Sequence, residues 1–207
     1  MMKKIITIPI VAFFSIYFMG NGLYSYQKKY IFKDQTIIDE KTGITIMTNE
    51  TKDLIIVTNY ILQYAIIFPY NNKWEFEIND KYALIGNCGT INISLQIHEN
   101  NNKTTEEFMS DLMKIYTENE SKYGVIDAKL IKYNKDLVLQ TVVDPTIIYK
   151  DDTFKNVKQI NYYSTKTFNN LRYEYHSSVI VDNDKKINEK DFLNFATKGF
   201  FIDFGRK

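Results

Sequence analysis

The pattern of hydrophobic and polar residues after residue 43 indicates short strands separated by polar turns. Residues 44–59 contain two β-branched runs around a polar turn, which predicts a β-hairpin. The apolar run 64–69 ends in Pro69, and proline ends a strand because it cannot donate a backbone hydrogen bond to a central ladder. Residues 82–99 predict a strand interrupted by glycines and followed by a regular alternation of apolar side chains.

The chain's one tryptophan, Trp74, follows this proline break and begins an alternation with Phe76 and Ile78. Charged residues occupy the positions between them, so residues 73–78 are predicted to form a half-buried strand. We therefore expect Trp74 to pack in the core rather than to stack on a ligand.

A helix is predicted after residue 103. Thr104 and Glu107 have the spacing of a capping box. The apolar face that follows, with a 3.6-residue period, consists of Phe108, Leu112, Ile115 and Tyr116. Lys122 and Gly124 are expected to end this helix.

A second helix is predicted near the C-terminal end of the sequence. Asn188 is expected to cap it, and it should cover residues 189–198. Its expected inward-facing residues are Phe192, Phe195 and Ala196.

Four strand patterns lie between the two helices, separated by short turns rich in Asn, Asp and Lys. They cover residues 125–133, 136–144, 157–165 and 171–181. The complete order predicts an α+β fold, with one antiparallel β-sheet and helices packed on it. Residues 26–43 are weakly periodic and are interpreted as a tether with room for one short strand. A single domain is therefore expected over residues 44–207.

The first residues have the order of a secretory signal. Lys3 and Lys4 precede an apolar run over 5–19, and small residues follow. Cleavage is expected after Gly22 or after Ser25. The signal peptide would send the protein out of the cytoplasm of a bacterial cell, to the periplasm or the medium.

An uncleaved membrane anchor is the alternative for the same segment. An apolar helix over residues 5–24 has the length that spans a bilayer, and Lys28 and Lys29 follow it as a flank. Membrane contact is then expected only through residues 5–24. A lipoprotein is excluded because the first cysteine in the sequence is Cys88.

The charge balance excludes an electrostatic surface for nucleic acid. The chain has 26 lysine and arginine residues and 25 aspartate and glutamate residues, a net charge of +1. Cleavage after Ser25 would remove two lysines and no acidic residue, which changes this net charge to −1. A nucleic-acid partner is not expected at this balance.

The stretch from Phe68 to Trp74 reads Phe-Pro-x-x-x-x-Trp, and its context resembles the PsbP-like fold. A strand ends near His98, and then come a Thr-Thr-Glu-Glu-Phe helix, a meander and a Phe-rich terminal helix. The resemblance covers about residues 44–207. It implies an α/β/α sandwich, as in photosystem extrinsic subunits, a Ran-binding protein family and DcrB-like bacterial envelope proteins. Members of this group mostly bind partners, and none of the shared motif residues is a catalytic group.

Few residues in the sequence suggest chemistry. Cys88 would be a nucleophile if His98 or His176 folded beside it, but a cysteine between glycines is typical of a small strand residue. Both histidines are expected in positions that do not hold a general base, with His98 near solvent and His176 on the less apolar face of its strand. Residues 182–191 match a calcium-loop template only in part and are interpreted as a solvated turn.

Further acidic and aromatic residues have structural interpretations. Asp144, Asp151 and Asp152 suit turns. The strand tyrosines are Tyr162, Tyr163, Tyr173 and Tyr175, and tyrosine is common in strands. We therefore expect no catalytic, cofactor-binding or metal-binding residue and no cofactor. The predicted function is a non-catalytic extracytoplasmic binding or assembly module with an envelope or secreted protein partner. The alternative is a small hydrolase or transferase that uses Cys88 or an unrecognised carboxylate site.

Overall fold

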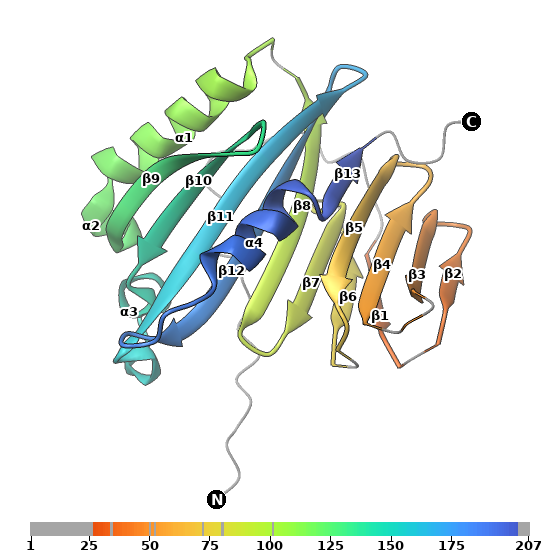
Figure 1. The fold of residues 1–207 in the computed structure, drawn as a ribbon, viewed down its shortest axis with the longest axis horizontal. Coiled ribbons are helices and arrows are strands. Elements are labelled where there is room, and N and C mark those ends of the chain that lie inside the picture. Colours follow the sequence, from red (N-terminus) through yellow and green to blue (C-terminus); the bar gives the residue numbers. More distant parts are fainter. Residues whose placement is uncertain are drawn as a thin grey trace, which may run out of the picture.

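The structure, a computed structural model, describes residues 27–202 except 34, 50, 52, 72, 80 and 101. Within these residues the fold consists of two antiparallel sheets with helices packed on the larger one (Figure 1). The larger sheet has eight strands. From edge to edge they are β1 (Lys28–Ile31), β6 (Glu75–Ile78), β7 (Leu84–Cys88), β8 (Ile91–Glu99), β12 (Leu171–Asp182), β11 (Val157–Phe168), β10 (Asp136–Val143) and β9 (Val125–Tyr133).

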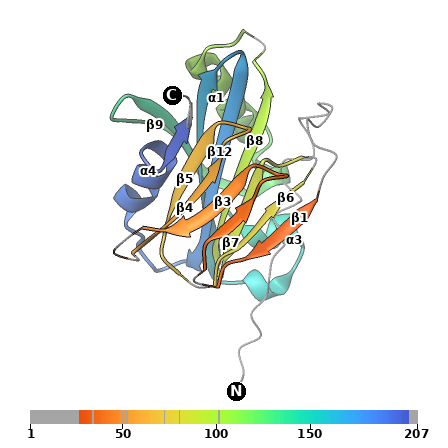
Figure 2. The same cartoon turned by 90° about the vertical axis from the view of Figure 1, so that its right-hand side faces the viewer.

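The smaller sheet has five strands among the residues described. In spatial order they are β13 (Phe200–Ile202), β5 (Tyr64–Pro69), β4 (Leu54–Asn59), β3 (Ile44–Thr48) and β2 (Ile37–Asp39). It lies against one face of the larger sheet, as the two ribbon views show (Figure 1, Figure 2). The prediction of an α+β fold is confirmed, whereas the prediction of one sheet is wrong. The chain changes sheets between β5 and β6, at the break that Pro69 introduces.

Four helices and one 3-10 turn complete the described part of the chain. They are α1 (Thr105–Glu118), α2 (Glu120–Tyr123), α3 (Pro145–Tyr149), the turn η3 (Asp152–Phe154) and α4 (Glu189–Thr197). Helices α1 and α4 pack on opposite faces of the larger sheet. Tyr163 of β11 contacts Tyr116 of α1, whereas its neighbour Tyr162 stacks on Phe192 of α4. Adjacent strand residues point to opposite faces, so the two helices lie on either side.

The main core fills the space between the two sheets. Ile46, Val57 and Ile66 of the smaller sheet belong to the same buried cluster as Leu95 and Tyr175 of the larger sheet. A second, smaller cluster lies under α1. Its buried members are Met109, Tyr116, Tyr123, Leu139 and Tyr163.

Trp74 lies in the main core, directly before β6, with 1% of its surface exposed. Its ring contacts Phe68 at a centroid distance of 4.9 Å and stacks on Phe76 at 5.8 Å. The indole Nε1 donates a hydrogen bond of 3.0 Å to the carbonyl oxygen of Pro69. Trp74 therefore fastens the start of the larger-sheet strand β6 to the end of the smaller-sheet strand β5, which explains why it follows the Phe-Pro break.

Residues 28–39 differ from the predicted tether. Strand β1 pairs with β6 and strand β2 pairs with β3, so this segment contributes an edge strand to each sheet. Tyr30 and Phe32 are buried in the main core. Tyr30 donates a hydrogen bond of 2.8 Å to Asp39, which also binds Lys28. The weak periodicity concealed these strands because each has only three or four residues.

The helix ends agree with the sequence in part. The capping box of Thr104 and Glu107 is present. Helix α1 ends at Glu118, earlier than predicted, and Gly124 instead caps the short helix α2 in the left-handed conformation with φ +60°. Asn188 is the N-cap residue of α4, as predicted. Its side chain makes no capping bond to the helix backbone and instead donates to the carboxylate of Asp191.

The predicted signal or anchor helix lies outside the described residues. Within the described part of the chain, no helix has the length and apolar character needed to cross a membrane.

Replacing Trp74 by alanine should lower the free energy of unfolding by about 3–5 kcal/mol, because a large ring would be lost from a closed core. Trp74→Phe is the matched control, since it keeps an aromatic ring and removes the indole hydrogen bond, and it should cost less. Urea unfolding measures both. A Trp74→Ala variant as stable as the parent would contradict the placement of Trp74 in the core.

Candidate functional site

The candidate site is a polar strip on the face of the larger sheet that α1 partly covers. It consists of Gln96 and His98 on β8 and Arg172, Glu174 and His176 on β12. Register places His98 beside Arg172 and Gln96 beside Glu174 on adjacent strands. The tyrosines between them on β12, Tyr173 and Tyr175, lie on the opposite face in the main core.

Glu174 is the acidic residue of this strip, and it is buried, with 7% of its surface exposed. Burial raises the pKa of the Glu174 carboxyl to about 8, and the charge of Arg172 opposes this rise. Its side chain therefore holds a proton near neutral pH. A carboxyl in this state donates a hydrogen bond or a proton rather than only accepting one.

His98 lies beside this carboxyl. Its Nε2 is 3.9 Å from a Glu174 oxygen, which is longer than a hydrogen bond. Burial lowers the pKa of His98. Near neutral pH both groups are uncharged, so the contact is an acid beside a neutral base and contributes no ion pair.

Arg172 connects the strip to the segment that leads into α1. Its Nη2 donates a hydrogen bond of 2.7 Å to the Asn100 side chain and a second to the carbonyl oxygen of Lys103. Its guanidinium lies over the Phe108 ring, 4.6 Å from the ring centroid. Through these contacts the Arg172 guanidinium holds the start of α1 on the sheet.

His176 belongs to a second group of buried polar side chains on the same face. Its ring stacks on Tyr163 at a centroid distance of 4.5 Å, and its Nε2 is 3.2 Å from the Asn161 side-chain oxygen. That oxygen also accepts from Gln159, and the Asn161 amide donates to Thr141. Burial lowers the pKa of His176 to about 3. The ring is therefore a neutral, fixed member of a hydrogen-bond network.

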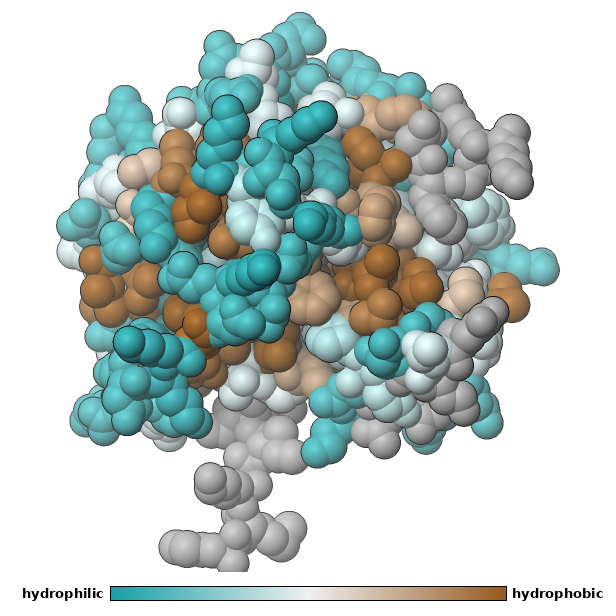
Figure 3. All heavy atoms as spheres, in the orientation of Figure 1, coloured by the Kyte–Doolittle hydropathy of each residue, from teal (hydrophilic) through white to brown (hydrophobic). Residues whose placement is uncertain are grey.

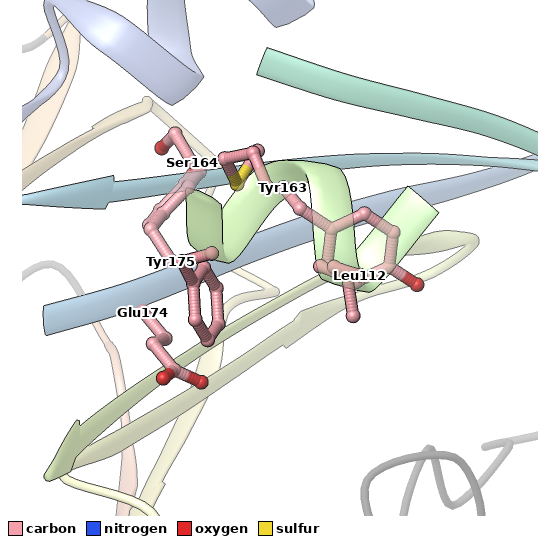
Figure 4. A pocket seen from close by; sticks show the side chains of 7 residues that line it. Leu112, Tyr163, Ser164, Glu174 and Tyr175 are labelled. Carbon is pink, nitrogen blue, oxygen red and sulfur yellow. The ribbon is translucent and has the colours of Figure 1, made fainter. Parts of the chain in front are cut away.

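A small cavity lies between α1 and the sheet, next to Glu174 (Figure 4). It measures about 10 Å³, room for about one water molecule. The lining residues are Phe108, Met109, Leu112, Tyr163, Ser164, Glu174 and Tyr175. Its apolar walls explain why the carboxyl of Glu174 keeps its proton.

Cys88 lies on the other face of the larger sheet. It pairs in register with Ile91 and belongs to the main core, whereas His98 and His176 belong to the polar strip. Burial raises the pKa of the Cys88 thiol, and the charge of Lys73 partly opposes this. The sheet separates the thiol from both imidazoles, so the described residues contain no cysteine–histidine pair.

The remaining sequence candidates have structural roles. The Asp144 and Asp151 carboxylates accept hydrogen bonds from the backbone N–H groups of Thr146 and Thr153, as expected for turns and caps. Residues 182–186 are exposed, in agreement with a solvated turn. The four strand tyrosines are buried. Across residues 27–202, apart from the six gaps, no three His, Cys, Asp or Glu side chains gather as a metal site would need.

The sequence did not predict the burial of His98, His176 and Glu174 correctly. His98 is partly buried rather than near solvent, and His176 is on the predicted polar face but fully enclosed. Glu174 was not singled out, although a charged residue in the middle of a long strand was the available signal. Alternation gives the face of a side chain, whereas burial depends on the cover that distant segments provide.

Glu174→Gln should flatten the pH dependence of stability. The carboxyl of the folded protein stays protonated up to about pH 8, whereas that of the unfolded chain ionises near pH 4.5, so stability falls as pH rises through this window. Glutamine does not ionise, and the variant should gain stability relative to the parent as pH rises, by about 5 kcal/mol at most.

Thermal unfolding from about pH 4.5 to about pH 9 measures this difference. Glu99→Gln, at an exposed position on the neighbouring strand β8, is the control and should leave the pH profile unchanged. A parallel profile for Glu174→Gln and the parent would show that Glu174 is ionised in the folded protein.

No family model and no curated protein sequence matches the chain. Among solved structures, the chain is similar to the solution structure of cyanobacterial PsbP (CyanoP) from Synechocystis sp. PCC 6803. The sequence identity is 11% and the TM-score is 0.39, over 88% of this chain and 96% of that chain. A similarity of this size concerns the fold and carries no site residue or activity to this chain.

Proposed function

We propose that the chain is a non-catalytic, extracytoplasmic binding or assembly module. The observation that carries this proposal is the size of the space beside the acid–base pair of Glu174 and His98. A substrate must reach the proton that a general acid transfers, within hydrogen-bond distance or through one water. The cavity at Glu174 has room for about one water molecule, whereas pockets for small molecules measure roughly 300–1,000 Å³.

The arrangement of the other reactive groups supports the same proposal. Arg172 is held by Asn100, Lys103 and Phe108, and His176 is held by Tyr163 and Asn161. A group that already has these partners must give them up before it can bind a substrate. The contacts of Arg172 and His176 therefore fit a structural role better than a role in turnover.

Export rests on the sequence. The basic start, the apolar run over 5–19 and the small residues that follow have the order of a secretory signal, and residues 5–24 have the length of an anchor. A cleaved signal, or an anchor with its basic start in the cytoplasm, would put the domain outside the cytoplasm.

A small enzyme is the second candidate, because one observation favours it. Raised pKa values beside a second titratable group are typical of catalytic sites, and Glu174 beside His98 has this character. Such an enzyme would need α1 to move away from Glu174 to admit a substrate. The Cys88 version of this alternative lacks a base, since both histidines are on the opposite face of the sheet.

Fractionation of the native cell should find the protein outside the cytoplasm, either released or attached to the membrane. An antibody against the domain would follow it through cytosolic, membrane and extracytoplasmic fractions. Full-length protein that is soluble in the cytosol would contradict the proposal that the protein is exported.

Cys88 should react slowly with iodoacetamide in the folded protein, because burial raises its pKa and the thiolate is the reactive form. The same protein unfolded in urea is the control and should react at the rate of an ordinary thiol. The rate is followed against pH. An apparent pKa well below that of a free thiol would favour the cysteine enzyme.

A further inference from the structure

The chain enters the fold without a tether. Strand β1 begins at Lys28 and pairs along its whole length with β6, so this residue has a fixed place at the edge of the larger sheet. The apolar segment with the length of a membrane span ends at residue 24, which leaves only residues 25–27 before β1. The four residue steps from 24 to 28 reach at most about 14 Å when extended. An uncleaved anchor would therefore hold Lys28 close to the bilayer.

The contacts of β1 identify the part of the molecule that lies beside Lys28. The Lys28 ammonium forms an ion pair with Asp39, at the end of β2. The Tyr30 hydroxyl donates to Asp39 and lies 2.9 Å from the hydroxyl of Thr42. The turn between β2 and β3, residues 40–43, is therefore next to the start of β1.

The turn between β4 and β5, residues 60–63, is bonded to this first turn. The Tyr60 hydroxyl donates a hydrogen bond of 3.0 Å to the carbonyl oxygen of Glu40. The buried side chain of Asn59 donates to the first turn and accepts a hydrogen bond of 3.0 Å from the backbone N–H of Ile61. These bonds make one rigid unit of residues 40–43 and 60–63, which we call the turn end.

Apolar side chains are exposed at and beside the turn end. Tyr60 is 55% exposed, Ile61 54%, and Ile38, directly before the end of β2, 69%; these are three of the four most exposed large apolar residues described. Ile61 packs on Gly43, where a β-carbon would lie 2.7 Å from the Ile61 Cγ1 atom, so its side chain has a fixed position. Apolar side chains also gather over β4 and β5, the strands that this turn joins (Figure 3).

A bilayer surface matches the turn end in chemistry and in place. Tyrosine prefers the membrane–water interface, where its ring contacts acyl chains and its hydroxyl keeps a polar partner. The nearby lysines already have acidic partners, since Lys28 pairs with Asp39 and Lys29 with Glu75. We therefore expect contact with zwitterionic lipid, without a need for anionic lipid.

We propose that residues 5–24 stay attached as a membrane anchor and that the turn end rests on the outer surface of the same bilayer, with Tyr60 and Ile61 in its interface. This docking rests on the proposed export of the domain, and it specifies the exported form and the end that faces lipid. It extends the membrane contact expected from the sequence beyond residues 5–24.

Ile126 is a matched control position, because it is 65% exposed and lies at the start of β9. Strand register connects this start across β10 and β11 to Ile180 on β12. The turn end meets the same strand at Tyr173, whose hydroxyl donates to the carbonyl oxygen of Leu62. Tyr173 and Ile180 are seven residues apart on β12, about 24 Å along the strand. Position 126 should therefore point away from the bilayer.

Fluorescence quenching in vesicles tests this orientation. The full chain with Ile61→Cys or Ile126→Cys is labelled with a thiol-reactive fluorophore and incorporated into phosphatidylcholine vesicles whose lipids carry a nitroxide near the headgroup. Quenching at position 61 should exceed that at position 126 at least about fivefold, because the two ends of the strands are far apart. The parent chain, whose Cys88 is buried, gives the background of that thiol. Equal quenching at both positions, or stronger quenching at position 126, overturns the proposal.

A charged substitution separates insertion of the turn end from simple tethering. With the label on Tyr60→Cys, adding Ile61→Asp should reduce quenching at least about twofold, because a carboxylate avoids the acyl boundary. Thr90→Asp is the control, since Thr90 is exposed in the turn between β7 and β8 at the opposite end of the strands, and it should leave quenching unchanged. Circular dichroism checks that each variant is folded. Unchanged quenching in the Ile61→Asp variant would show that Ile61 is not in the interface and would overturn the proposal.

The N-terminus of the native protein separates this proposal from export itself. The intact mass of protein purified from native membranes should include residues 5–24. A native chain that begins after Gly22 or after Ser25 overturns the anchor and the docking, while it supports export through a cleaved signal. A cytosolic location in the fractionation experiment would instead contradict export.

Discussion

The alternation of side chains along β12 is the constraint on which both faces of the larger sheet depend. This strand has twelve residues and lies between β8 and β11, near the middle of the sheet. Tyr173 and Tyr175 point into the core that the two sheets share, so Arg172, Glu174 and His176 must point to the α1 face. A shift of one residue would put the charged side chains into the main core and is therefore strongly disfavoured.

Burial of polar groups on the α1 face has a consequence for electrostatics. Glu174 keeps its proton because burial under the apolar side chains of α1 raises the pKa of its carboxyl more than the charge of Arg172 lowers it. Arg172 directs its hydrogen bonds to the segment before α1, and His176 joins the network through Asn161. Arg172 thus joins the segment before α1 to the sheet by polar contacts, while Tyr116 and Met109 of α1 add apolar burial.

The two sheets use their faces differently. The larger sheet has helices on both sides, so both of its faces are covered in its central part. The smaller sheet has one face in the main core, and its other face has exposed apolar residues such as Ile38 and Phe201. The proposed binding or assembly role does not require the cavity beneath α1 to open.

Sequence by itself determined the local elements of this protein. The capping box of Thr104 and Glu107, the end of β5 at Pro69 and the burial of Trp74 follow from spacing and alternation, which act over a few residues. The long strands β9 to β12 were predicted nearly to their ends for the same reason.

Only the tertiary structure decided that the strands divide into two sheets, and that β1 and β2 complete their edges. It also decided that His98 and Glu174, 76 positions apart in the sequence, lie 3.9 Å apart, and that side chains of α1 cover Glu174. Strand pairing and cover come from distant segments, and a pattern of period two gives the face of each residue but not what lies against that face.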